Sequence, residues 1–207
     1  MRRTLCLILC VCIIAASSVY VSANYDASAI SPRGGGRNTL NVPLEKQINT
    51  YYCGPASVKM VLSYLGVSAT QSTLGTRMQT NQSDGSFVWR VTECLNHYLG
   101  ANSYEHVLTT TTPFPTGLMA SIDDNKPVIC HVMTRELPNY PDGRNSGHYV
   151  VATGYFWAQG GTGSSGTDAV YYNDPHYDNA YYGSYSCRWS EMTAAINANH
   201  SYYIMGT

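Results

Sequence analysis

One cysteine stands where an irregular segment is expected to turn into a helix. Cys53 is followed by Gly54 and Pro55, and proline is favoured just inside a helix start because its missing N–H costs nothing there. A thiol at that place faces unpaired backbone N–H groups and the positive end of the helix dipole. Both favour the thiolate, which is the form that attacks carbonyl carbon. We expect Gly54 to let a substrate backbone approach closely. Taken alone, these residues fit a nucleophile and an inert or disulfide-bonded cysteine equally well.

Two later segments supply a histidine and a carboxylate. His148 follows Gly147 at the start of a strand-like apolar run, and Asp174 ends the next such run, before Pro175. If these strands pair antiparallel, His148 and Asp174 become neighbours, as a general base and its orienting acid must be. Adjacent strand residues point to opposite faces, so only one of Asn173 and Asp174 can face the histidine. We favour Asp174 because of its charge.

Together these motifs resemble the C39-like cysteine peptidases of the papain-fold superfamily. The matching segments are Gln47, Tyr52-Cys53-Gly54-Pro55-Ala56-Ser57, Gly147-His148-Tyr149-Val150-Val151 and Asn173-Asp174-Pro175. The resemblance extends over residues 41–207 and includes a glutamine six residues before the cysteine. It implies that Cys53 is the nucleophile and His148 the general base and acid. It also implies that Asp174 orients the imidazole and that Gln47 donates to the oxyanion hole.

The resemblance implies a secreted cysteine peptidase that hydrolyses peptide or protein substrates through an acyl-enzyme intermediate. Two alternatives stay open: an acyl or peptidyl transferase with the same triad, and a catalytically silent binding module of papain fold. In the second alternative, the tyrosine-rich stretch over residues 171–185 would form a contact surface. Members of this family that cut double-glycine leaders are fused to an ABC exporter. Because no further apolar run of spanning length follows, we do not carry the leader substrate over.

A metal site is a third class of hypothesis. His131, His148, Asp174 and His176 could converge, but no tight ligand spacing such as H-E-x-x-H occurs. We therefore expect neither a metal nor a cofactor.

Composition excludes other classes of function. The chain has 207 residues, 12% of them charged, with a formal net charge of -1, so it has no basic excess to bind nucleic acid. Its aromatic and aliphatic content is too high for a disordered chain. We expect one soluble, cored domain and favour a monomer.

The N-terminus has the pattern of an export signal. Arg2 and Arg3 precede an apolar run over residues 5–16, and Val21-Ser22-Ala23 offers the small residues that a signal peptidase recognises. The run is shorter than the roughly 20 residues of a membrane-spanning helix. We predict a signal peptide over residues 1–23, an extracellular location, and no membrane association after cleavage.

Cleavage would leave four cysteines in a compartment where disulfides persist. If Cys53 stays a free thiol, at most one internal bridge can form among the other three. Cys94 and Cys187, the latter expected in a loop, are the better bridge candidates. Cys130 lies in an apolar run and is expected to be a buried small hydrophobe.

Hydrophobic periodicity predicts an α+β domain over residues 41–207, after a flexible lead-in over residues 24–40. Helices are expected over residues 56–65, 87–99, 116–124 and 190–198, the last with Ser190 as N-cap and Thr193 at the capping-box position. Strands are expected over residues 127–133, 148–156, 169–173 and 202–205. A long mobile loop over residues 160–166 would join the second and third of these strands. In this arrangement the helices come first and pack on an antiparallel sheet, and the nucleophile opens the first helix.

Overall fold

Seven strands form one antiparallel sheet in the computed structural model, which describes residues 36–158 and 168–207. The strands are β1 (Gly36–Thr39), β2 (Tyr104–Leu108), β3 (Val128–Met133), β4 (Gly147–Trp157), β5 (Ala169–Asp174), β6 (Gly183–Arg188) and β7 (Tyr202–Gly206). Their order is β2-β7-β3-β4-β5-β6, and β1 pairs with the far end of β4. The longest strand, β4, is therefore the centre of the sheet.

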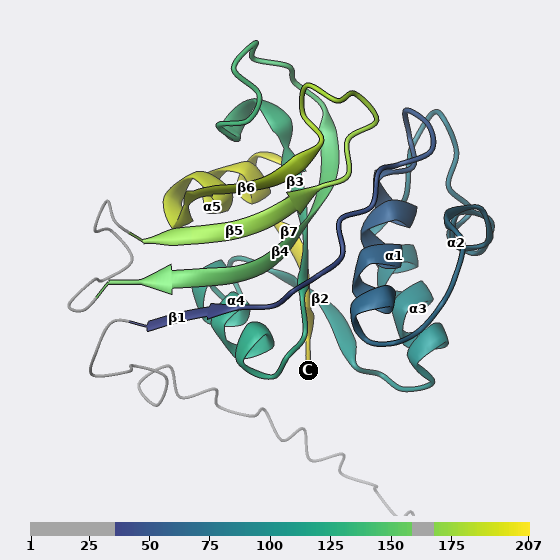
Figure 1. Cartoon of the computed structure of the whole chain (residues 1–207), viewed down its shortest axis with the longest axis horizontal. Coiled ribbons are helices and arrows are strands. Elements are labelled where there is room, and N and C mark those ends of the chain that lie inside the picture. Colours follow the sequence, from purple (N-terminus) through teal and green to yellow (C-terminus); the bar gives the residue numbers. More distant parts are fainter. Residues whose placement is uncertain (1–35, 159–167) are drawn as a thin grey trace, which may run out of the picture.

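The described part of the chain also has five α-helices and one short 3-10 helix, η1 (Thr134–Glu136). The α-helices are α1 (Cys53–Tyr64), α2 (Gln71–Met78), α3 (Val88–Leu99), α4 (Phe114–Asp123) and α5 (Trp189–Ala198), and of these α2 packs on α1 and α3. Figure 1 shows α1, α2 and α3 grouped on one side of the sheet, and α4 and α5 on the other. The predicted α+β class, with helices packed on an antiparallel sheet, is confirmed.

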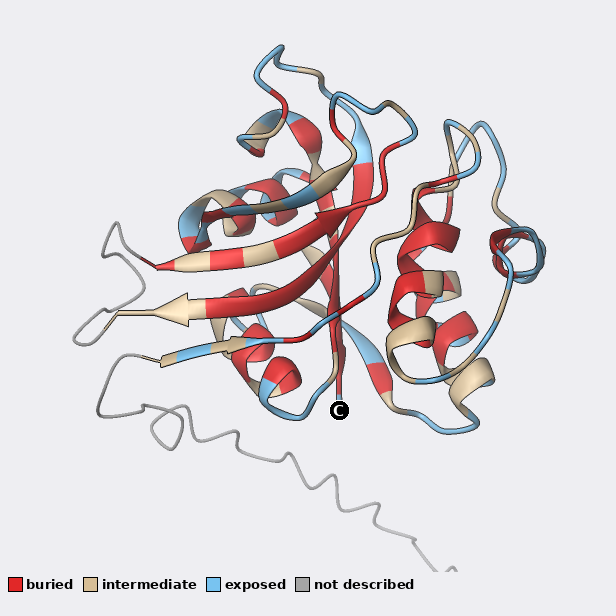
Figure 2. Ribbon diagram, viewed as in Figure 1, coloured by how far each residue is buried: buried red, intermediate tan, exposed pale blue. Residues whose placement is uncertain are grey.

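Burial on both faces explains the composition of β4. Tyr149, Val150, Val151 and Ala152 are consecutive and all buried, and Figure 2 shows the buried colour running along the strand. A strand covered on both faces has a continuous apolar run, whereas a half-exposed strand alternates apolar and polar residues. Several layers of packing therefore fix the position of this strand.

The predicted helices and strands correspond to α1, α3, α4, α5, β3, β4, β5 and β7, with shifts of a few residues at the ends. The prediction missed α2, β1, β2 and β6. Two details were wrong. Helix α5 begins at Trp189 rather than after Ser190, and the Glu191 carboxylate accepts a hydrogen bond from the Arg188 N–H at 2.8 Å. The segment predicted to be a flexible lead-in also ends in a strand, since Gly36–Thr39 pairs with β4.

Several predictions lie outside the described residues. These are the signal peptide over residues 1–23, the rest of the lead-in up to residue 35, and the loop over residues 160–166. The boundary of the predicted domain at residue 41 stays a prediction. Within residues 36–158 and 168–207, no helix combines the length and the apolar character needed to cross a bilayer.

All four cysteines of the described chain are free thiols and buried, so the bridge suggested for Cys94 and Cys187 is not present. Cys187 also lies in β6 and not in a loop, whereas Cys130 is fully buried, as expected. The core therefore forms without a covalent cross-link among these four residues.

Candidate active site

The start of α1, the start of β4 and the end of β5 meet at one place. Cys53 is the first residue of α1, His148 the second residue of β4, and Asp174 the last residue of β5. Because β4 and β5 pair antiparallel, the beginning of one lies beside the end of the other, and Val151 faces Asn173 across the ladder. His148 and Asp174 are therefore neighbours, as antiparallel pairing of these two strands predicted.

The three side chains are neighbours. His148 Nε2 lies 2.8 Å from Asp174 Oδ1, and Cys53 lines the same two cavities as His148, close enough that each of these two groups shifts the pKa of the other. Because Nε2 faces the carboxylate, Nδ1 is the nitrogen left for the thiol. The exposed fraction falls from 9% at Cys53 to 5% at His148 and 0% at Asp174. Cys53 is therefore the most exposed of the three residues and Asp174 the most deeply buried.

Asp174 accepts hydrogen bonds on both carboxylate oxygens. Oδ1 also accepts from the His176 backbone N–H at 3.0 Å, while Oδ2 accepts from the Tyr140 hydroxyl at 2.8 Å and from Asn139 Nδ2 at 3.0 Å. Burial raises the pKa of the Asp174 carboxyl, but the charge of His148 and these hydrogen bonds outweigh it, so the pKa lies below its ordinary value. Asp174 therefore stays ionised although it is buried.

His148 is held in the protonated form by its neighbours. Burial lowers the pKa of the imidazole, but the Asp174 carboxylate and the contact with Cys53 raise it to about 10. A positive charge is thereby kept beside the thiol at neutral pH.

The Cys53 thiol is correspondingly acidic. Burial raises its pKa, whereas His148 and hydrogen bonds with the backbone of Tyr149 and Gly54 lower it, and the net pKa is below 9.0. Helix α1 has no side-chain cap and no acidic residue in its first turn, so its N-terminal N–H groups also favour a negative charge there. The site can thus hold a thiolate–imidazolium pair, which is a prepared nucleophile.

Gln47 lies in the same cavity as Cys53 and His148. The side chain is buried, and its Nε2 donates one hydrogen bond to the Asn49 backbone carbonyl at 2.6 Å. The amide nitrogen carries a second hydrogen, and that hydrogen is what an oxyanion donor requires. Gln47 N–H donates to the Pro175 carbonyl at 2.7 Å, so the glutamine is tied to the residue after Asp174.

Asn173, the alternative partner of His148, points elsewhere. Its Nδ2 donates to the Val42 carbonyl at 3.0 Å and its Oδ1 accepts from the Ser184 hydroxyl at 2.7 Å. Asp174 is therefore the residue that faces the imidazole.

Close approach of a substrate backbone at Gly54 stays a prediction, and the structure shows another constraint at this position. A Cβ atom at this position would lie 2.5 Å from Ser86 Oγ and 2.8 Å from Ser86 Cβ. The glycine is required because the segment before α3 packs directly on the start of α1, and close approach of a substrate is not needed to explain it.

Two cavities meet at the thiol and form the arms of one cleft. They share Cys53, Asp84, Gly85, Gly147 and His148. The aromatic arm, of about 420 Å³, is also lined by Phe87, Trp89, His131, Tyr149, His200 and Tyr202. The polar arm, of about 470 Å³, is also lined by Gln47, Thr50, Ser83, Arg144, Ser146 and Tyr177. A chain crossing the cleft would therefore pass over the sulfur.

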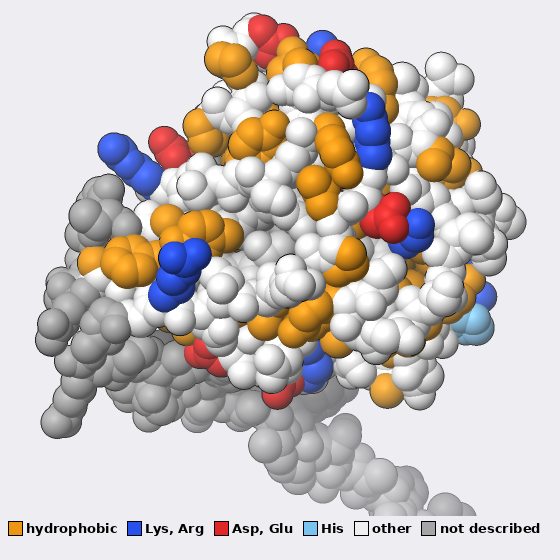
Figure 3. Space-filling view, viewed as in Figure 1, with side chains coloured by type: hydrophobic (Ala, Val, Ile, Leu, Met, Phe, Trp, Pro, Cys, Tyr) orange, Lys and Arg blue, Asp and Glu red, His pale blue; other side chains and the backbone are white. Residues whose placement is uncertain are grey.

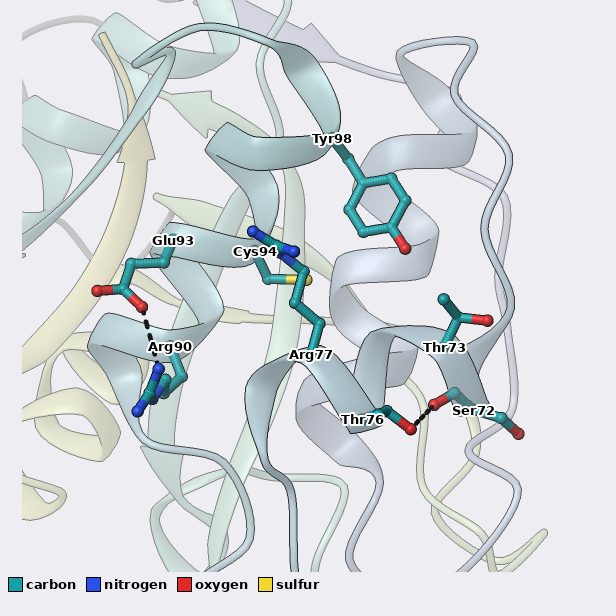
Figure 4. Close-up of a pocket in the computed structure, with 8 residues that line it drawn as sticks. All are labelled: Ser72, Thr73, Thr76, Arg77, Arg90, Glu93, Cys94 and Tyr98. Atoms are coloured by element: carbon teal, nitrogen blue, oxygen red, sulfur yellow. Dashed lines mark hydrogen bonds and ion pairs between the residues drawn. The ribbon is translucent and has the colours of Figure 1, made fainter.

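A separate cavity of about 680 Å³ lies between α2 and α3 (Figure 4). It contains Cys94, but burial raises the pKa of that thiol to about 11, and Arg90 is paired with Glu93 at 3.6 Å. No histidine lines it. This cavity lacks the base that would make its cysteine reactive.

The residues considered for a metal site do not form one. His131 stacks on Tyr149, with ring centroids 4.5 Å apart, and His176 reaches the Asp174 carboxylate through its backbone. Among the described residues, no group of three or more His, Cys, Asp or Glu side chains is placed to hold a metal ion.

On the face in Figure 3 the charged side chains are scattered, with no broad patch of one sign. The tyrosines of residues 171–185 do not form one exposed surface either, because Tyr172 and Tyr181 are buried.

Sequence reasoning did not identify Asn139 and Tyr140 as neighbours of the candidate site. They lie in the connection between η1 and β4, and Tyr172 Oη donates to Asn139 Oδ1 at 2.8 Å. No local pattern marks such residues, because their role depends on where that connection folds back over Asp174.

Known proteins share this architecture. A family model described as "Peptidase_C39 like family" matches residues 39–203. A search of curated proteins found no match.

Three solved structures show how far the likeness extends. A protein from Bacillus anthracis described as a C39-like peptidase aligns with TM-score 0.58 and 16% identity, over 83% of this chain and 98% of its own. A double glycine motif protease from an AMS/PCAT transporter, in complex with the leader peptide, aligns with TM-score 0.51 and 18% identity, over 82% of this chain and 93% of its own. The peptidase domain of Streptococcus ComA, a bifunctional ABC transporter involved in quorum sensing, aligns with TM-score 0.50 and 20% identity, over 79% of this chain and 96% of its own. At these identities the likeness shows the fold.

Proposed function

Because the chain belongs to the Peptidase_C39 like family, we propose that it is a cysteine peptidase with Cys53 as nucleophile. His148 is the general base and acid, Asp174 orients the imidazole, and Gln47 completes the oxyanion hole. The family and the fold support the cysteine peptidase class. The observation that supports these assignments is that His148 is hydrogen-bonded to Asp174 and lines the same cleft as Cys53.

In the first step the Cys53 sulfur attacks the carbonyl carbon of the scissile peptide bond. A C–S bond forms, and the carbonyl π electrons move onto oxygen. That oxyanion accepts hydrogen bonds from the Cys53 backbone N–H and from the Gln47 amide. Each such donor is typically worth about 2.7–4 kcal/mol of the barrier.

In the second step His148 gives its proton to the leaving amine, the C–N bond breaks, and a thioester remains on Cys53. Neutral His148 then takes a proton from water, whose oxygen attacks the thioester carbonyl carbon. The C–S bond breaks, the Cys53 thiolate leaves, and the acid product is released with His148 protonated again. Asp174 keeps the imidazole oriented through both proton transfers, because its bond to Nε2 leaves Nδ1 towards the sulfur.

Peptides are the proposed substrates. The double glycine motif protease of similar fold was solved with its leader peptide. In this chain the cleft has an arm on each side of Cys53, as a substrate extending in both directions would need.

We also propose that the protein acts outside the cell after removal of residues 1–23, on the strength of the charged, apolar and small-residue pattern of that segment. Expression of the full chain in its source cells followed by N-terminal sequencing of the protein in the medium tests this. A first residue of Asn24 is expected, and retention of the full chain inside the cell would refute the proposal.

Cleavage of a peptide library tests the assignment of the nucleophile. We expect no cleavage by Cys53→Ala. We expect a slow residual rate, reduced at least about a hundredfold, for Asp174→Asn, because the amide can hold the wrong tautomer of His148. Cys94→Ala, which removes another buried thiol, is the matched control and should cleave at the rate of the unmodified chain. Equal cleavage by Cys53→Ala and the unmodified chain would show that the nucleophile is misassigned.

A further inference from the structure

Two large aromatic side chains are exposed beside the candidate nucleophile. Phe87 and Trp89 are each 45% exposed, and their rings stack with centroids 4.5 Å apart and planes 15° from parallel. Phe87 is the N-cap of α3 and Trp89 its second residue, and both line the aromatic arm, which Cys53 and His148 also line. An exposed aromatic pair retains a large apolar area in contact with water, which a bound apolar group can cover.

The segment that carries this pair is fixed to the catalytic elements. The Ser86 carbonyl accepts a hydrogen bond from the Tyr149 hydroxyl at 2.8 Å, and the Ser86 side chain packs on Gly54. The Ser86 hydroxyl also lies 2.8 Å from that of Thr80. Because Tyr149 follows His148 and Gly54 follows Cys53, the aromatic pair has a set position relative to the reacting groups. A site fixed in this way loses little conformational entropy when it binds.

One wall of the aromatic arm is formed by two stacked, uncharged rings. The His131 ring stacks on Tyr149, and burial, with the charges of His200 and His148, lowers the pKa of His131 to about 4. At neutral pH this wall is therefore a neutral ring face. Asp84 is the one carboxylate among the residues that line this arm.

The polar arm differs in chemistry although it is similar in size. Its lining includes Arg144, Asp84 and several hydroxyl and amide side chains, and its one stacked ring pair, His176 and Tyr177 with centroids 4.6 Å apart, contains an imidazole in place of a second large apolar ring. The two sides of Cys53 thus differ in chemistry, and the aromatic arm is the one that can select a substrate side chain by apolar contact.

We propose that the aromatic arm is a specificity subsite that takes a bulky aromatic side chain of the peptide substrate, close to the bond that is cut. The inference rests on the proposed function and adds a substrate class to it. The cavity of about 420 Å³ falls within the range of pockets that enclose a small ligand, about 300–1,000 Å³. A glycine at this position would leave Phe87 and Trp89 in water and most of the arm unfilled. An aromatic ring covers the pair and reaches the His131–Tyr149 wall.

Binding to a catalytically inert protein tests the subsite without requiring turnover. The Cys53→Ala chain is titrated with peptides that differ in one position, scanned along the sequence, where Phe replaces Gly. At one position Phe should bind at least about tenfold tighter, a difference of about 1.4 kcal/mol. Trp89→Ala in the same background should reduce that preference to less than about threefold, whereas Trp89→Tyr, which keeps a ring, should retain most of it.

Ile48→Ala is the matched control, because Ile48 is 59% exposed and lines neither arm. It should leave the Phe/Gly ratio unchanged. Thermal unfolding of each variant separates loss of the subsite from loss of the fold, and Phe87→Ala, which removes the other ring of the pair, serves if Trp89→Ala does not fold.

The outcomes separate this proposal from the proposed function. Equal binding of Phe and Gly peptides at every position, or a preference that Trp89→Ala leaves intact, overturns the subsite even if the unmodified chain cleaves peptides. A preference that depends on Trp89, in a protein that cleaves none of these peptides, supports the subsite and contradicts the peptidase.

Discussion

The Cys53 thiol and the His148 imidazole each favour the charged form of the other. Burial alone would keep the thiol protonated, and the imidazolium is what reverses this. The other three thiols have no such partner, and burial raises the pKa of each: to about 11 for Cys94, to about 12 for Cys187, and further for Cys130. Reactivity should therefore be confined to one of four buried cysteines.

Alkylation by iodoacetamide checks this difference. At pH 7 the native protein should be modified at Cys53 alone, with a rate that follows an apparent pKa below 9.0. His148→Gln removes the positive charge and leaves burial unopposed, so the rate at pH 7 should fall at least about tenfold, one pKa unit. Mapping of the modified residue by mass spectrometry gives the site. An unchanged rate in His148→Gln would show that the imidazole does not activate the thiol.

Tyr140 supports the same system from behind Asp174. Tyr140→Phe removes one of the two hydrogen bonds to Oδ2, and a bond to a charged group contributes roughly 1.5–3 kcal/mol. The pKa of Asp174 should rise, and kcat/KM should decrease about tenfold because the carboxylate orients the imidazole less firmly. The acidic limb of the pH profile of kcat/KM should move to higher pH, an effect that a purely structural tyrosine would not produce.

Tyr181→Phe is the control for Tyr140→Phe. Tyr181 stacks on Tyr140 with ring centroids 4.8 Å apart, but its hydroxyl donates to Asp142 at 2.7 Å rather than to Asp174. Its kcat/KM should stay within about twofold, because the Tyr181 hydroxyl does not bond to the Asp174 carboxylate. Equal losses in the two variants would mean that Tyr140 acts through packing.

At the scale of elements, the start of α1 and the segment before α3 are fitted to each other. Gly54→Ala places a methyl group against Ser86 and should reduce the free energy of unfolding by about 1–3 kcal/mol, the usual cost of overpacking. Ser86→Gly removes the atoms that clash, so the double variant should recover part of this loss. Urea unfolding of the two single variants and the double variant measures the coupling. Additive losses would contradict the contact.

The elements that were predicted from sequence share strong local signals. Helix α3 has an apolar stripe and ends at a glycine, and β4 has an unbroken apolar run. Helix α2, Gln71–Met78, has few apolar residues, and β6 is polar at alternate positions near the edge of the sheet, so neither stands out from a loop. These two elements are ordered by tertiary packing, which a local pattern does not contain.

The candidate site was predictable to a similar extent. Cys53, His148 and Asp174 each lie at an element boundary with a glycine or proline beside it, so pairing of β4 with β5 was enough to predict that the last two meet. Asn139 and the Phe87–Trp89 pair had no such signal. Their relation to the site arises from loop paths and from packing on Ser86, which become visible only in three dimensions.

At the scale of the whole molecule, the buried charges link folding stability to pH. The pKa of His148 is raised from 6.5 to about 10. Its contribution to the free energy of unfolding is therefore complete below pH 6.5 and is lost as the pH rises through about 10. The pKa of Cys53 is lowered from 9.0, so its contribution is complete above pH 9.0 and is lost as the pH falls through the lowered pKa. The two contributions change in opposite directions on the way to pH 9.0.

Cys53→Ala removes one of these opposing contributions. The unfolding free energy of the unmodified chain should therefore change less between pH 6.5 and 9.0 than that of the variant, and the difference between them should grow in favour of the unmodified chain as the pH rises. Urea unfolding at several pH values in this interval gives both curves. A difference that does not depend on pH would show that the thiol is not ionised in the folded protein.

The most direct test of the account is to capture the intermediate. Protein quenched in acid during turnover of a peptide or ester substrate is digested, and the acylated residue is identified by mass spectrometry. The account predicts a thioester on Cys53 that hydroxylamine removes. Turnover with no acyl group on Cys53, or with the acyl group on another residue, would contradict it.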